Sequence, residues 1–145
     1  MTVEKVITTC FYLGKLPYAP GSWGSLGTIV LWLFLPVDYL IHSTVILFLF
    51  IIGVYYSKQA AEKLKIHDPS EVVIDEAVGM GISLFMLPHS FILYFIAFCL
   101  FRVFDIFKPS FVFQVQSLPG GWGIMLDDVL AGFFTLAIVT GLSSL

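Results

Sequence analysis

Residues 120–132, GGWGIMLDDVLAG, place two adjacent aspartates, Asp127 and Asp128, directly before an apolar run. From Val129 to Leu145 the chain carries no charged residue, which is typical of a membrane-spanning helix. A carboxylate at the centre of a bilayer costs about 2.5 kcal/mol or more, so it requires a metal ion, a charged partner or a watery position. The fold therefore has to bring such partners to the start of this apolar segment.

The composition is that of a membrane protein. Of the 145 residues, 59% are hydrophobic and 12% are charged, whereas a soluble domain carries about 25% charged residues. A membrane-spanning helix needs about 20 apolar residues. Five stretches approach or partly fill that length: 24–41 (interrupted by Pro36), 43–61, 75–87, 90–107 and 127–145. We therefore predict an all-α integral membrane protein, with residues 1–145 forming one membrane-embedded domain, a compact bundle of about five transmembrane or re-entrant helices.

The charged residues predict the orientation of this bundle. If the amino terminus is inside, all 7 Lys and Arg residues fall on the inner side, and the connections near 36–43 and 88–90 contain neither. Because basic residues mark the cytoplasmic side, we predict a multi-pass protein with its amino terminus inside. All of the acidic residues except Asp38 lie on that same side. The net charge of −3, without a long basic run, does not indicate a nucleic-acid partner, and the oligomeric state is left open.

Acidic residues gather at the predicted cytoplasmic ends of three apolar stretches. Carboxylates without Cys or paired His favour magnesium or manganese over zinc or copper. Asp75 and Glu76 are adjacent and would point about 100° apart on a helix, so they are not expected to face one ion together. Simple stabilisation of a helix start by these two acids is the alternative. The candidate metal ligands are Asp68, Asp75, Glu76, Asp105, Asp127 and Asp128, and all of them except Asp68 are also candidate catalytic residues.

Basic residues and a Gly/Ser segment indicate a phosphate site on the same side. Arg102 and Asp105 are three residues apart and share a helical face, which predicts an ion pair. Guanidinium and ammonium groups suit a phosphate. In PGSWGS, residues 20–25, a loop opening the first apolar helix would offer backbone N–H groups and hydroxyls to an anion. The candidate phosphate-binding residues are Arg102, Lys108, Ser22, Ser25 and His67. Together the acidic and basic groups predict a metal-dependent enzyme that acts on a phosphorylated lipid.

Four segments, taken in order, resemble the phosphatidylglycerophosphatase A family. They lie within 20–25, 68–79, 101–109 and 120–132. Ser22 stands where the motif is expected to carry threonine, a change that keeps the hydroxyl. The resemblance implies a magnesium-dependent phosphatase of the bacterial inner membrane with its active site at the cytoplasmic face. It further implies that the lipid phosphatidylglycerophosphate is hydrolysed to phosphatidylglycerol and inorganic phosphate.

Two other functions stay as alternatives. A small transporter would spread its acidic residues through the depth of the bilayer, whereas here they gather on one side. A metal-dependent lipid phosphotransferase would carry the pattern D-x2-D-G-x2-A-R, which this chain lacks. For a phosphatase, a metal-activated water is the expected nucleophile, and attack by an aspartate is the open alternative.

Overall fold

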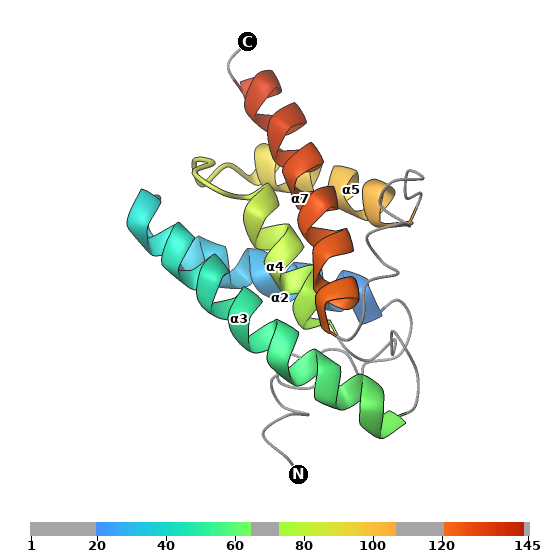
Figure 1. The fold of residues 1–145 in the computed structure, drawn as a ribbon. Coiled ribbons are helices and arrows are strands. Elements are labelled where there is room, and N and C mark those ends of the chain that lie inside the picture. The colour runs from blue at the N-terminus through green and yellow to red at the C-terminus, as the bar shows by residue number, and fades with distance from the viewer. Residues whose placement is uncertain (1–19, 65–72, 107–120, 144–145) are drawn as a thin grey trace.

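A computed structural model describes residues 20–64, 73–106 and 121–143, and these ranges are all-helical. The helices, labelled in Figure 1, are α2 (Pro20–Phe34), α3 (Tyr39–Leu64), α4 (Ile74–Ser83), α5 (Phe91–Ile106) and α7 (Gly121–Ser143). The all-α prediction is therefore confirmed over the described residues. Two segments, Tyr39–Gln59 in α3 and Met125–Ser143 in α7, are long and apolar enough to cross a membrane. The larger number of about five spanning or re-entrant helices stays a prediction.

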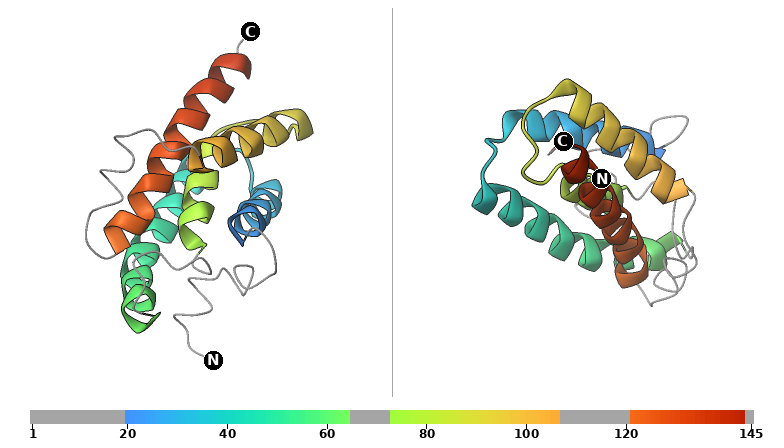
Figure 2. Two further views of the ribbon diagram at one scale, coloured as in Figure 1. Left: turned by 90° about the vertical axis from the view of Figure 1, so that its right-hand side faces the viewer. Right: turned by 90° about the horizontal axis from the view of Figure 1, so that it is seen from above.

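The short helix α4 forms the centre of the structure. It packs most extensively against α7 and also contacts α2, α3 and α5, and Figure 2 shows these helices arranged around it. Every residue of α4 except Glu76 is buried. A helix buried on all sides is typical of a core element, so α4 fixes the positions of the helices around it.

Two glycines allow α4 and α7 to approach closely. A Cβ atom on Gly132 would lie 2.5 Å from the carbonyl oxygen of Gly79. A Cβ atom on Gly79 would lie 2.7 Å from the carbonyl oxygen of Asp128 and 2.5 Å from the ring of Phe101. These atoms are backbone or ring atoms that cannot move aside easily, so a side chain at either position would force the two helices apart.

The far end of α4 is fastened by a buried histidine. His42 of α3 accepts a hydrogen bond through Nδ1 from the backbone N–H of Met86, at 3.0 Å. Met86 has a φ of 59°, a conformation that costs a non-glycine residue roughly 1–2 kcal/mol. Beside it, the fully buried Trp32 lies against His42, with ring centroids 5.4 Å apart, and fills the space next to Gly81.

Three helix boundaries differ from the sequence-based expectations. The stretch 24–41 is divided between two helices, because α2 ends at Phe34 and Asp38 starts α3 by accepting hydrogen bonds from Leu40 N and Ile41 N. Residues 20–25 form the first turns of α2 and not a loop, and a proline is well suited to the first helical position. The third difference is in α7, which begins at Gly121, so Asp127 and Asp128 lie in its second turn.

The glycine contact between α4 and α7 can be tested with a matched pair of alanine variants. Gly132→Ala is expected to lower the free energy of unfolding by about 1–3 kcal/mol, because the helices must separate to admit the new methyl group. Gly141→Ala is the control in the same helix, since a Cβ atom there would meet no heavy atom within 4 Å. Denaturant unfolding of both proteins in detergent measures the difference. Equal stability of the two variants would contradict the close contact.

Candidate metal and phosphate site

Five of the predicted acidic residues meet at one end of α4. Asp75 and Glu76 lie in its first turn, Asp105 lies near the end of α5, and Asp127 and Asp128 lie in the second turn of α7. Both α4 and α7 begin at this end and run in the same direction (Figure 1). Asp75 precedes Gly79 by four residues, and Asp128 precedes Gly132 by four. The glycine contact therefore lies one helical turn from the acids and sets the spacing between them.

The five carboxylates form two overlapping groups. The Asp127 group consists of Asp75, Asp127 and Asp128, and the Asp105 group consists of Glu76, Asp105 and Asp128. In each group, one oxygen from every carboxylate lies within 4.8 Å of the others. Asp75 and Glu76 belong to different groups, although they are adjacent in the sequence. Asp128 belongs to both groups.

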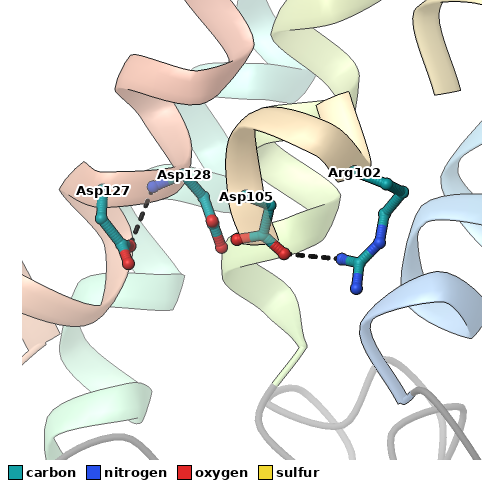
Figure 3. A network of polar contacts seen from close by, with 4 residues as sticks. All are labelled: Arg102, Asp105, Asp127 and Asp128. Carbon is teal, nitrogen blue, oxygen red and sulfur yellow. Dashed lines mark hydrogen bonds and ion pairs between the residues drawn. The ribbon is translucent and has the colours of Figure 1, made fainter. Parts of the chain in front are cut away.

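Arg102 and Asp105 form the predicted ion pair. Their Nη1 and Oδ2 atoms are 2.7 Å apart, and the side chains are only 16% and 11% exposed. Figure 3 shows Asp105 between Arg102 and Asp128, with its carboxylate turned toward Asp128. The Nε atom of Arg102 is buried and has no hydrogen-bond partner among the described residues. A guanidinium held in this way keeps a donor for a second anion next to the carboxylates.

Asp127 is held in place by its neighbour. The backbone N–H of Asp128 donates a hydrogen bond to Oδ1 of Asp127, at 2.8 Å (Figure 3). Both residues are almost fully buried, each with 1% of its surface exposed. Such a bond fixes one oxygen of Asp127 and leaves the carboxylate oriented before any ligand binds.

Burial and mutual repulsion make this cluster unfavourable when all of its members are ionised. α4 has ten residues and is about 15 Å long, too short to cross a bilayer. Burial, followed by the negative charges of Glu76 and Asp128, raises the pKa of Asp75 well above its ordinary value. Although Glu76 as a whole is half-buried, desolvation of its carboxyl group raises the pKa of Glu76 to about 7. The ionised cluster therefore requires compensating positive charge.

The oxygen atoms themselves fit a hard divalent cation. Asp75 Oδ1, Glu76 Oε2 and Asp128 Oδ1 are buried without a hydrogen-bond partner among the described residues. An unpaired buried carboxylate oxygen is costly, so each of these atoms favours a ligand. Magnesium and manganese prefer such oxygen ligands. Among the described residues, the two groups of possible metal ligands contain only carboxylates.

The start of α2 lies beside the first turn of α4. A Cβ atom on Gly24 would lie 3.0 Å from Cβ of Val73, the residue directly before α4. Ser25, a predicted phosphate-binding residue, follows Gly24 and is fully buried. Ser22 belongs to the same helix, but its side chain lies outside the described part of the structure, as do the three predicted residues His67, Asp68 and Lys108.

Ser57 is a candidate site residue that was not predicted from the sequence. Its hydroxyl is fully buried and has no partner among the described residues. It lies one turn after Gly53, and a Cβ atom on Gly53 would meet Met125 and Ile74, which are close in sequence to Asp127 and Asp75. A single serine in an apolar stretch does not by itself indicate a functional residue. Only its spacing of four residues from Gly53 indicates that both lie on the same face of α3.

Comparisons with known proteins agree on one family. The family described as Phosphatidylglycerophosphatase A matches residues 6–143. The chain is 37% identical to the phosphatidylglycerophosphatase A of Escherichia coli K12, over 89% of this chain and 77% of the relative. It is 38% identical to the protein of the same name from Haemophilus influenzae, over 89% of this chain and 82% of the relative.

A further relative has another name. A Bacteroides thetaiotaomicron protein, provisionally named a phosphatidylinositol-3-phosphatase, is 40% identical over 92% of this chain and 89% of its own length. No solved structure matches the chain significantly. All three relatives are named as phosphatases of phospholipids, and the family match includes every described residue of the acidic cluster. The chain therefore belongs to the phosphatidylglycerophosphatase A family of enzymes.

Proposed function

We propose that this enzyme is a magnesium-dependent phosphatase that hydrolyses phosphatidylglycerophosphate to phosphatidylglycerol and inorganic phosphate. The observation that carries the proposal is the convergence of five carboxylates from three helices beside Arg102. The names of the Escherichia coli and Haemophilus influenzae relatives support this substrate. The net reaction adds water across the terminal phosphate ester, so an alcohol headgroup and inorganic phosphate are the products.

Each part of the site has a role in this proposal. The carboxylates of the Asp127 and Asp105 groups would hold magnesium. Bound magnesium would supply polarisation of the phosphoryl group and activation of water. Arg102 keeps its ion pair with Asp105 and offers its remaining N–H donors to phosphate oxygens. The further proposed phosphate contacts are Ser22, Ser25, His67 and Lys108, and Asp68 is a further proposed metal ligand.

The enzyme is proposed to be a multi-pass protein of a bacterial inner membrane, with its site at the cytoplasmic face. Its named relatives are bacterial, and the apolar segments of α3 and α7 support a membrane location. Large apolar side chains on α3, among them Leu47, Phe48 and Ile51, are 58–61% exposed and would lie against lipid tails. A site at one end of the helices would meet a lipid headgroup, which lies at the membrane surface. This location of the acids also disfavours a transporter.

A second candidate substrate is phosphatidylinositol 3-phosphate, which the name of the Bacteroides thetaiotaomicron relative indicates. Both lipids carry a phosphate monoester on the headgroup, so the carboxylates and Arg102 would act on the same chemical group in each. The two substrates differ in the alcohol that carries the phosphate. Discrimination between them would therefore depend on contacts with the alcohol.

Phosphate release from lipid vesicles tests the proposed reaction and substrate together. Vesicles containing phosphatidylglycerophosphate are expected to release inorganic phosphate in the presence of magnesium, and EDTA is expected to stop the release. Parallel vesicles contain phosphatidylinositol 3-phosphate at the same surface density. Faster release from the inositol lipid would assign the second candidate substrate. Undiminished release after exhaustive chelation would contradict the magnesium requirement.

Asp105→Asn tests the proposed metal site. The substitution removes one negative charge from the Asp105 group and is expected to lower kcat/KM by about 100-fold or more, because the metal and the ion pair with Arg102 are both weakened. Asp38→Asn is the control, since the amide keeps the oxygen that accepts from Leu40 N and Ile41 N at the start of α3. Phosphate release is measured for both proteins after equal folding has been verified. Near-normal turnover of Asp105→Asn would show that this residue is not a required ligand.

Arg102→Lys tests whether the guanidinium geometry binds phosphate. Lysine keeps the charge but loses the planar set of donors that can contact Asp105 and phosphate together. The loss of one charge-assisted hydrogen bond, about 1.5–3 kcal/mol, corresponds to a decrease in kcat/KM of about tenfold or more. Steady-state kinetics with the lipid substrate measures this effect. Unchanged kinetics would mean that Arg102 acts only as a positive charge.

A further inference from the structure

Asp128 is the one residue common to the two groups of carboxylates defined above. We propose that the site binds two divalent cations side by side, one in the Asp127 group and one in the Asp105 group, with the carboxylate of Asp128 bridging them. This inference rests on the proposed function and deepens it, because it gives the number of ions and divides the carboxylates between them.

The helical geometry divides the acids between two ions. Asp75 and Glu76 are adjacent on α4 and belong to different groups. On α7, Asp127 belongs to one group only, whereas its neighbour Asp128 belongs to both. A turn of 100° between adjacent residues allows each pair to present carboxylates in two directions. Asp105 on α5 then completes the group that contains Glu76.

The buried carboxylate oxygens also favour two bound cations. Each group contains two residues with a carboxylate oxygen that has no hydrogen-bond partner among the described residues: Asp75 and Asp128 in one, Glu76 and Asp128 in the other. Asp75 and Asp128 are only 4% and 1% exposed, so bulk water is largely excluded from them. One ion in the Asp127 group would contact Asp75 and Asp128 but not Glu76, and one ion in the Asp105 group would contact Glu76 and Asp128 but not Asp75. Two ions satisfy both groups.

The charges of the site also favour two cations. Among the described residues, the five carboxylates and the guanidinium of Arg102 together carry a charge of about −4 when all are ionised, since each side chain contributes about one unit charge. One divalent cation would leave half of this negative charge uncompensated in a buried site, whereas two would neutralise it. Paired ions about 3.5–4 Å apart, held by shared oxygen ligands, are found in other phosphatases. Each group is small enough to surround one ion, because its three ligand oxygens lie within 4.8 Å of one another.

Binding of manganese to the full chain in detergent tests this arrangement without relying on activity. Mn²⁺ replaces Mg²⁺ as a paramagnetic probe, and electron paramagnetic resonance measures both free Mn²⁺ and coupling between bound ions. The wild-type chain is expected to bind about two Mn²⁺ and to give the spectrum of a spin-coupled pair, because bridged ions lie about 3.5–4 Å apart. Binding of a single Mn²⁺, or of two uncoupled ions, would overturn the proposal.

Variants assign the ions to the two groups. Asp127→Asn changes only the Asp127 group and keeps an oxygen for the hydrogen bond from Asp128 N, and Asp105→Asn changes only the Asp105 group. Each is expected to lose one of the two ions and the coupled spectrum. Asp128→Asn is expected to weaken both ions, while Asp38→Asn, outside both groups, keeps the wild-type spectrum. Retention of the coupled pair in Asp127→Asn or Asp105→Asn would overturn the assignment.

Phosphate release by the same preparations separates this inference from the proposed function. A spin-coupled pair in a folded chain that hydrolyses neither phospholipid would support the two-ion site and contradict the lipid phosphatase. Magnesium-dependent hydrolysis by a chain that binds one Mn²⁺ would support the phosphatase and overturn the two-ion site.

Discussion

The contact between α4 and α7 at Gly79 and Gly132 controls the geometry of the acidic cluster. Asp75 and Asp128 lie four residues before these glycines on two helices that run in the same direction. The distance between the two helix backbones therefore determines the distance between the two carboxylates. Any side chain at the contact would separate the acids as well as the helices. The same small residues that permit close packing thus also determine whether the carboxylates can share a ligand.

Close packing and electrostatics oppose each other at this end of α4. The apolar contacts of the core bring buried carboxylates together, and their mutual repulsion and desolvation favour separation or protonation. Arg102 offsets part of this charge through Asp105. A bound cation would offset more, so metal binding and stability are expected to be linked in this protein. The fold holds the acids in place, and a bound cation is expected to stabilise the fold in return.

The opposite end of α4 shows how a helix of ten residues is held in register. The bond from Met86 N to His42 Nδ1 and the packing of Trp32 against Gly81 fix the end of the helix that lies away from the acids. Because α4 is buried and short, a shift at one end would move the other. His42 and Trp32 are therefore structural residues that support the site from a distance, and nothing in their local sequence indicates this role.

The sequence by itself determined the helical class, the ion pair between Arg102 and Asp105, and five acids that meet in the described part of the site. These features depend on apolar composition and on the repeat of the α-helix, both of which can be read from residues that are close together in the sequence. Local patterns did not predict the helical start of α2 at Pro20 or the early start of α7 at Gly121. The tertiary structure alone decided which carboxylates share a group, that Asp128 joins both groups, and that Ser57 and His42 are buried. Those features arise from contacts between helices far apart in the sequence, where glycine contacts set distances that no local period encodes.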